Sequence, residues 1–118
     1  MNIIFAVQNN NGWESDISSR FGRTEGYICY SDENNEISYH SNEENVNAGH
    51  GAGIQAGQIV IGLKADVVIA GGDIGPKAFQ VLKGAGVKMY CQIGEIKLKE
   101  ALESFKNGKY LELSESGK

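Results

Sequence analysis

A short apolar run that leads into a glycine-rich turn and a proline constrains the fold of this chain most. Residues 67–70 (Val-Val-Ile-Ala) carry no polar side chain, as expected for a strand of a parallel sheet that is buried on both faces. Residues 71–75 include three glycines, and Pro76 suits the first position of a helix, where a missing N–H costs nothing. A strand, a tight turn and a helix in this order predict an α/β fold with the turn at its ligand-facing edge.

Other patterns of polar and apolar residues extend this unit along the chain. Residues 2–8 form a nearly continuous apolar run typical of a central strand, and the polar residues 32–35 indicate a hairpin turn between two mixed segments. The predicted strands are 2–8, 27–31, 36–41, 67–70 and 87–91, and the predicted helices run from the glycine-rich segment 47–51 to about Leu63, from Pro76 to 84–86, and across Leu98, Ala101, Leu102 and Phe105.

This order predicts a mixed five-stranded sheet flanked by helices, in which a three-strand meander precedes an α-β-α-β-α segment. The first two strands are expected to be antiparallel and the last two parallel, with right-handed crossovers. The loop 9–24, the helix start at His50, the Gly72 turn and the strand exit at Cys91 then lie at one edge of the sheet.

Backbone N–H groups, a helix dipole and Lys77 favour an anion at this edge. The spacing of the glycines matches no nucleotide-binding motif, so no nucleotide is expected. The alternative is that the glycines at the turn serve only tight packing between helix and sheet.

Size and charge narrow the classes of function. The chain has 118 residues, 41% of them hydrophobic, which suits a single domain, and the polar tail beyond Gly108 is expected to be loosely held. A net charge of −4 argues against nucleic-acid binding, so any anion must meet a local cationic cluster. No segment has the length and apolarity to cross a membrane and no leader precedes the first strand, which predicts a cytoplasmic protein. Cys29 and Cys91 have neither metal-binding nor disulfide spacing and are expected to be reduced thiols.

Three short motifs identify the chain as similar to a known family. They are, in chain order, Ser15-x-Ile17-Ser18-x-x-Phe21-Gly22-Arg23, Gly49-His50-Gly51 and Gly72-x-Ile74-Gly75-Pro76-Lys77-Ala78. The chain resembles the dinitrogenase iron–molybdenum cofactor biosynthesis family, which includes nitrogenase accessory proteins and the molybdenum–copper orange protein. The resemblance implies one such domain at 1–108, a tail at 109–118 and a ribonuclease-H-like α/β fold. Nuclease activity is not implied, because the first strand ends in Gln8 and carries no carboxylate for two-metal catalysis.

The resemblance implies a non-enzymatic carrier of an anionic metal–sulfur cluster, containing molybdenum with iron or copper, in metallocofactor assembly or storage. The cluster is expected to be held non-covalently by a monomer or weak dimer and exchanged with cofactor donor and acceptor proteins. An enzyme is disfavoured, because no nucleophile–base pair falls at the ligand edge. The alternative is a regulatory module that binds an oxyanion or a phosphorylated metabolite and acts through a protein partner.

Cations and glycines of the three motifs are the candidate ligand contacts. Arg20 and Arg23 offer rigid donors to a sulfide or oxyanion cluster, or else staple their loop through salt bridges to Glu14 or Asp16. Lys77 either contacts the ligand or points into solvent. The predicted cofactor-binding residues are Arg20, Phe21, Gly22, Arg23, Gly49, His50, Gly51, Gly72, Ile74, Gly75, Pro76 and Lys77.

Two side chains are candidate metal ligands. The imidazole of His50 suits a soft metal, or else caps a loop. The thiol of Cys91 is the weaker candidate, since a single cysteine is commonly a small buried hydrophobe. Gly53 and Gly57 are expected to allow close contact of their helix with the sheet.

Overall fold

Five strands form one mixed sheet in the computed structural model, which describes residues 1–46 and 51–114. They are β1 (Asn2–Val7), β2 (Gly26–Ser31), β3 (Glu36–Ser41), β4 (Val67–Ile69) and β5 (Lys88–Tyr90). Their spatial order is β3-β2-β1-β4-β5. β2 is antiparallel to both β1 and β3, whereas β1, β4 and β5 are parallel. The predicted meander and the predicted mixed sheet are therefore confirmed.

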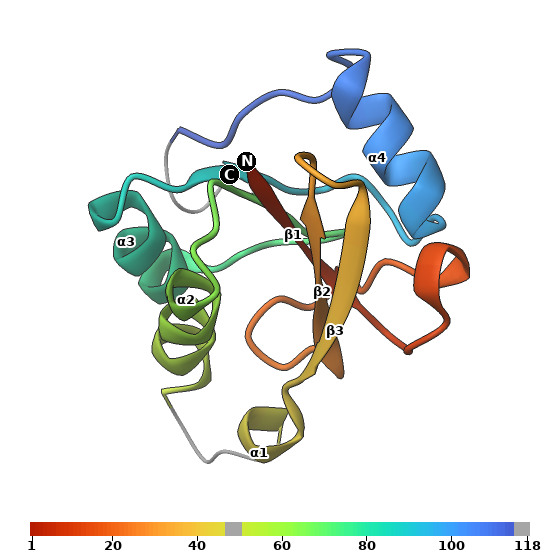
Figure 1. Cartoon of the computed structure of the whole chain (residues 1–118). Coiled ribbons are helices and arrows are strands. Elements are labelled where there is room, and N and C mark those ends of the chain that lie inside the picture. The colour runs from red at the N-terminus through yellow and green to blue at the C-terminus, as the bar shows by residue number, and fades with distance from the viewer. Residues whose placement is uncertain (47–50, 115–118) are drawn as a thin grey trace.

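Helices cover both faces of this sheet (Figure 1). Helices α2 (Ala52–Gly62) and α3 (Pro76–Gly84) lie on one face, and α4 (Leu98–Lys106) lies on the other beside the 3-10 turn η1 (Gly12–Glu14). A one-turn helix, α1 (Glu43–Val46), follows β3. None of the described helices has the length and apolarity needed to span a membrane.

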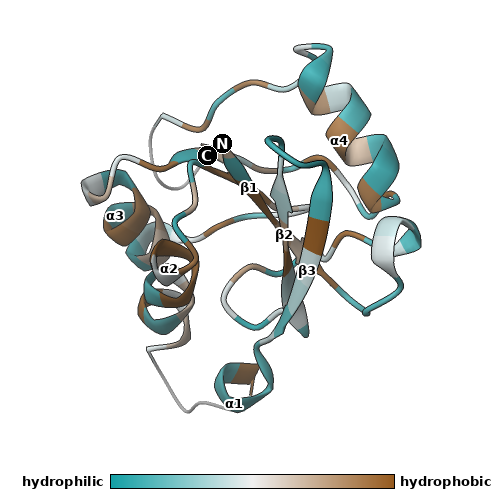
Figure 2. Ribbon diagram, viewed as in Figure 1, coloured by the Kyte–Doolittle hydropathy of each residue, from teal (hydrophilic) through white to brown (hydrophobic). Residues whose placement is uncertain are grey.

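The central strand β1 supplies apolar side chains to both layers. Ile4 and Ala6 face α2 and α3, while Ile3, Phe5 and Val7 face α4, as the two-residue period of a strand requires. All five side chains are buried. Figure 2 shows β1 as hydrophobic over most of its length, whereas the edge strand β3 is largely hydrophilic. The continuous apolar run at the start of the chain therefore marks the middle of a two-layer core.

Two short elements were not predicted from the sequence. The turn η1 is closed by Ser15, whose Oγ accepts the Asn11 N–H at 2.8 Å. Helix α1 is a single turn in which the Asn45 N–H donates to the Asn42 carbonyl at 2.9 Å. Both are too short to produce an amphipathic period, so hydrophobic patterning does not reveal them.

The glycines of α2 contact another helix, and the expectation of a helix–sheet contact is corrected. A Cβ at Gly57 would lie 2.9 Å from Val81 Cγ1 in α3. A Cβ at Gly53 would lie 3.5 Å from the Ala78 nitrogen at the start of α3. Close packing is therefore correct as a prediction, but the partner is α3, because both helices share one face of the sheet.

The described part of the C-terminal tail is held against β5, contrary to the expectation of a loose tail. The Leu113 N–H donates to the Met89 carbonyl at 2.7 Å, and Lys83 Nζ donates to the Ser114 carbonyl at 3.1 Å. The Leu113 side chain packs against the core beneath α2 and α3. Leu113 packs against the core whereas Leu111 in the same segment is exposed, a difference that composition alone does not reveal.

Candidate functional site

Three loops that are far apart in sequence are joined at the edge where the parallel strands end. The Gly71 N–H donates to the Ser18 carbonyl at 2.8 Å, and the Gly94 N–H donates to the Gly71 carbonyl at 3.0 Å. The Gln92 N–H donates to the Gly72 carbonyl at 3.1 Å. The loop after β1, the turn after β4 and the segment after β5 thus meet at the edge where α/β sheets bind ligands, as predicted.

The glycines of the turn after β4 have different roles. A Cβ at Gly71 would lie 2.8 Å from the Ser18 carbonyl oxygen, and a Cβ at Gly72 would overlap the Ser19 carbonyl oxygen. These two glycines therefore allow two backbones to approach closely. Gly75 differs, because its φ of +90° favours glycine and a Cβ there would meet nothing within 4 Å. The space beside the Gly75 Cα, at the start of α3, is therefore not filled by neighbouring atoms.

Substituting Gly72 with alanine is expected to lower the free energy of unfolding by about 1–3 kcal/mol, because the new methyl group must push away a backbone carbonyl. Urea unfolding measures the change. Gly84→Ala is the matched control, since a Cβ there meets nothing within 4 Å and alanine favours the last turn of α3. Equal stability of Gly72→Ala and the parent would contradict the packing role.

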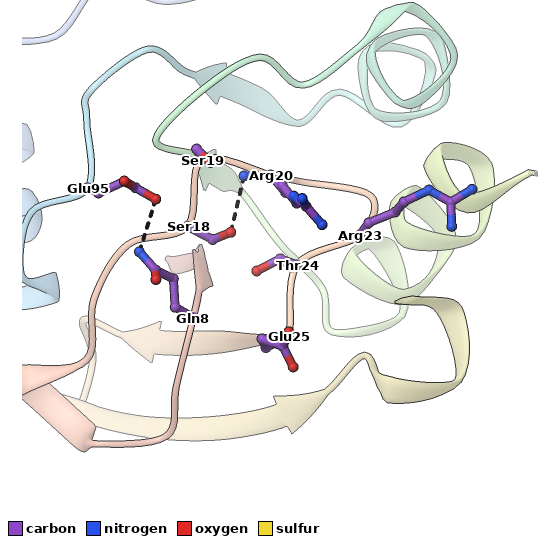
Figure 3. Close-up of a pocket in the computed structure, with 8 residues that line it drawn as sticks. All are labelled: Gln8, Ser18, Ser19, Arg20, Arg23, Thr24, Glu25 and Glu95. Atoms are coloured by element: carbon purple, nitrogen blue, oxygen red, sulfur yellow. Dashed lines mark hydrogen bonds between the residues drawn. The ribbon is translucent and has the colours of Figure 1, made fainter. Parts of the chain in front are cut away.

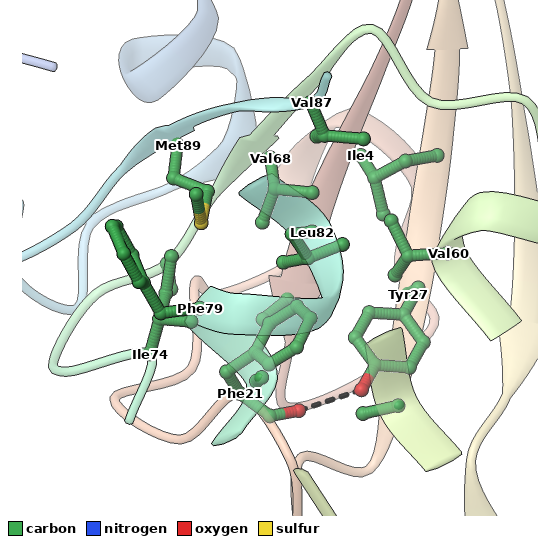
Figure 4. Close-up of a cluster of buried hydrophobic side chains, with 14 residues drawn as sticks. Ile4, Phe21, Tyr27, Val60, Val68, Ile74, Phe79, Leu82, Val87 and Met89 are labelled. Atoms are coloured by element: carbon green, nitrogen blue, oxygen red, sulfur yellow. Dashed lines mark hydrogen bonds between the residues drawn. The ribbon is translucent and has the colours of Figure 1, made fainter. Parts of the chain in front are cut away.

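A buried ring and side-chain hydrogen bonds hold the loop between β1 and β2 against the core. The Phe21 ring is buried below α3, and Tyr27 Oη donates to the Phe21 carbonyl at 2.6 Å (Figure 4). Thr24 Oγ1 donates to the Val7 carbonyl at 2.7 Å. Asn42 and Asn45 donate from the other side of the loop to the Gly22 carbonyl, each at 3.0 Å. The part of the loop after η1 is therefore held by side-chain donors although it contains no helix or strand.

This loop forms one wall of a pocket of about 360 Å³. Figure 3 shows Arg20 and Arg23 on one side of it and Gln8 and Glu95 on the other. The Gln8 Nε2 group donates to Glu95 Oε2 at 3.1 Å. The full lining is Gln8, Ser18, Ser19, Arg20, Arg23, Thr24, Glu25 and Glu95. Two arginines, two serines and a threonine thus line a pocket that is also lined by two glutamates.

The two arginines are placed differently. Arg20 is exposed at the surface of the loop, and its N–H donates to Ser18 Oγ at 3.1 Å. Arg23 is half-buried, and its Nη1 donates to the Val46 carbonyl of α1 at 3.0 Å. The predicted salt bridges to acidic neighbours are not formed, because Glu14 and Asp16 pair with Lys99 and Lys97 at 2.5 and 2.9 Å, respectively. Both arginines line the pocket, and the Arg23 side chain extends from it toward α1 (Figure 3).

The N-termini of α2 and α3 lie beside the same loop. A Cβ at Gly22 would lie 3.3 Å from Gly53 Cα in the first turn of α2. The equivalent atom at Gly53 would lie 3.5 Å from the Ala78 nitrogen and 3.9 Å from Lys77 Cβ in the first turn of α3. Two helix N-termini and the exposed Lys77 therefore add positive potential next to residues 18–25, which contain Arg20 and Arg23 and are called the arginine loop.

Residues 1–108 match the family model of the dinitrogenase iron-molybdenum cofactor proteins. The chain belongs to this family. An uncharacterized protein of Methanocaldococcus jannaschii is 30% identical over 111 residues, which cover 92% of this chain and 88% of that protein.

Solved structures agree with this assignment to the dinitrogenase iron-molybdenum cofactor family. The apo form of the orange protein from Desulfovibrio gigas superposes with a TM-score of 0.93 at 28% identity, covering 99% of this chain and 96% of that one. A Thermotoga protein described as a putative NifB protein of the DUF35 family superposes with a TM-score of 0.83 at 27% identity, covering 99% of this chain and 97% of that one. The resemblance inferred from the three motifs is therefore confirmed.

The cysteines of this dinitrogenase cofactor-family protein are poorly suited to bind a cluster as thiolates. Burial raises the pKa of the Cys91 thiol, and the Asp73 carboxylate raises it further. Burial also raises the pKa of Cys29. A raised pKa leaves less thiolate near neutral pH, and the thiolate is the form that binds metals. Within residues 1–46 and 51–114, no three His, Cys, Asp or Glu side chains are grouped as a metal site requires.

Replacing Cys91 with serine is expected to change the affinity for a copper–tetrathiomolybdate cluster by less than about twofold, because the thiol is mostly protonated. The measurement is a titration followed by visible absorbance, with Cys29→Ser as the parallel variant. Loss of the cluster from a folded Cys91→Ser protein would show that the thiol binds it.

The structure places most of the predicted family-motif residues at one edge, but not all as side-chain contacts. Phe21 and Ile74 are 2% and 6% exposed and belong to the core, so their side chains support the loop and the turn from below. Gly51, with a φ of +80°, precedes α2. Pro76 is exposed at the first position of α3. Gly49 and His50 lie outside the described residues.

Sequence reasoning missed several polar residues that line the pocket. They follow strands or lie in the loop without a recognisable spacing, and only the folded sheet brings them together. Ser18 belongs to the first of the three family motifs, and this membership is the signal that could have identified it as a pocket residue. The missed residues are Gln8, Ser18, Ser19, Thr24, Glu25 and Glu95.

Proposed function

We propose that this protein carries an anionic metal–sulfur cluster, containing molybdenum with iron or copper, in the pocket beside the arginine loop. The observation that carries the proposal is the convergence of Arg20 and Arg23 with the N-termini of α2 and α3 at one edge. Guanidinium groups and helix N-termini are donors that favour anions. The cluster is cargo, so no bond within it needs to be broken by the protein.

Retention in this proposal depends on charge and hydrogen bonds. The hydroxyl groups of Ser18, Ser19 and Thr24 line the same pocket as the arginines, and Lys77 lies at the adjoining helix start. His50, which precedes α2 in the sequence, is proposed to add a bond to the metal. A site without a full set of thiolates releases its cargo easily, which suits delivery.

The cellular setting is part of the same proposal. A protein that delivers a cluster needs a donor and an acceptor, and we infer that both are metallocofactor proteins of the cytoplasm. We propose that the protein acts as a monomer or weak dimer in this role.

Titration of the anaerobic protein with tetrathiomolybdate and Cu(I) tests the function. We expect visible absorbance that saturates near one cluster per chain and that weakens as salt rises, since a partly exposed site is screened. Orthophosphate is the competing probe. Tight phosphate binding without cluster binding would favour an oxyanion or phosphorylated-metabolite module and would overturn the carrier role.

Removing a pocket carboxylate is expected to strengthen binding of the anionic cluster. Glu25→Gln and Glu95→Gln should each raise the affinity by about two- to fivefold, the effect of one exposed like charge. Glutamine at 95 keeps an oxygen for the hydrogen bond from Gln8. The control is Glu103→Gln, on the exposed surface of α4. Weaker binding by the two pocket variants would mean that these carboxylates bind a metal.

A further inference from the structure

Two asparagines are buried behind the arginine loop. Asn42 and Asn45 are 2% and 3% exposed. Asn42 Nδ2 donates to the Gly22 and Thr24 carbonyls at 3.0 and 2.9 Å. Asn45 Nδ2 donates to the Gly22 and Ala52 carbonyls at 3.0 and 2.8 Å. Both amide groups therefore use their donors on main-chain carbonyls, and Gly22 accepts from both.

Each asparagine has an acceptor that finds no donor. Within the described part of the chain, the Oδ1 atoms of Asn42 and Asn45 are buried without a hydrogen-bond partner. A buried unpaired oxygen is unfavourable and offsets part of what the donated hydrogen bonds contribute to stability. Each asparagine therefore holds the loop with both of its donors while its own acceptor stays unpaired.

These asparagines connect the arginine loop to two helices. The Asn42 N–H donates to the Glu25 carbonyl at 3.0 Å, and Asn45 joins the Gly22 carbonyl to the first residue of α2. At the end of α1, the Val46 carbonyl accepts the hydrogen bond from Arg23 Nη1 at 3.0 Å. The same short turn thus fixes both the backbone on either side of Arg23 and the guanidinium group itself.

We propose that Asn42 and Asn45 are positioning residues of the pocket. They hold the carbonyls of Gly22 and Thr24, which fixes the backbone that presents Arg23 to the cargo. The inference rests on the proposed function. It adds that affinity depends on a loop ordered before binding, because ordering it during binding would cost conformational entropy.

Asn45→Leu tests the inference most cleanly. The Gly22 carbonyl keeps its bond from Asn42, and the unpaired Oδ1 atom is removed together with the donors. With tetrathiomolybdate and Cu(I) as the probe, we expect affinity to fall by at least about tenfold in a variant that still unfolds cooperatively, with a melting temperature lowered only by the loss of the donor to the Ala52 carbonyl. Asn45→Ser, with a smaller side chain, guards against steric misfolding. Asn107→Leu, at the exposed end of α4, is the matched control.

A double-mutant cycle separates positioning from a general structural role. If Asn45 acts through Arg23, Asn45→Leu should add less than about threefold in an Arg23→Gln background, because effects of coupled residues are not additive. Parent-like binding by Asn45→Leu, independent effects of the two substitutions, or unfolding of both Asn45 variants would each overturn the inference. Failure of the parent to bind the probe would instead overturn the proposed function, and this inference with it.

Discussion

Exchanging Arg20 and Arg23 together for glutamine is expected to weaken binding of a copper–tetrathiomolybdate cluster by about a hundredfold or more. Each charge-assisted hydrogen bond contributes about 1.5–3 kcal/mol, and the loss of two corresponds to at least this factor. Both arginines line the same pocket. The measurement is an absorbance titration of parent and variant at equal, low ionic strength.

A matched pair of lysines controls for the change in net charge. Lys88 and Lys109 are exposed, at the start of β5 and in the tail. Changing both to glutamine removes the same charge away from the arginine loop and should leave the affinity within about twofold of the parent, because exposed charges beyond a Debye length are screened. Equal losses in the two double variants would show a non-specific charge effect in place of a site.

Phe21→Ala is expected to lower the free energy of unfolding by about 3–5 kcal/mol, which is a large share of the stability of a domain of this size. The ring is 2% exposed, and its centroid lies 5.6 Å from that of Tyr27. Its loss leaves a cavity beneath the arginine loop. Urea unfolding followed by circular dichroism measures the change.

Phe105→Ala is the comparison for this variant, because Phe105 is only half-buried and packs on the other face of the sheet. Phe105→Ala should lower the free energy of unfolding by less than Phe21→Ala does, and it should leave the arginine loop undisturbed. An unchanged urea midpoint for Phe21→Ala, together with lost cluster binding, would mean that the phenyl ring contacts the cargo and does not support the core.

The sequence predicts the strands and helices well where burial in the core requires apolar residues at regular positions. Residues 2–8 and 67–70 are apolar on both faces because β1 and β4 lie in the middle of the sheet. Pro76 begins α3 as expected for a residue without an N–H. The turns η1 and α1 are not predictable from hydrophobic patterning, because each is a single turn closed by local hydrogen bonds involving Ser15 or Asn42. The packing of Leu113 against the core is not predictable either, because a single apolar side chain produces no periodic pattern.

The site is only partly predictable. Arg20, Arg23 and Lys77 are recognisable as cations within glycine-rich motifs, and the fold brings them to one edge. Glu95 and Gln8 belong to the pocket through tertiary contacts more than 80 residues apart in sequence, which no local pattern records. The role of Phe21 also required the structure, because a motif does not reveal which side chains point into the core.

An NMR titration of isotope-labelled protein with tetrathiomolybdate and Cu(I) tests the central claim most directly. Binding at the arginine loop predicts amide shift changes concentrated at residues 18–25, at the start of α2 and at residues 72–78, which decrease as salt is raised. Residues of α4 should not shift, because this helix covers the opposite face of the sheet from α2 and α3. No shift changes at the arginine loop, or salt-independent changes centred on Cys29 or Cys91, would contradict the account.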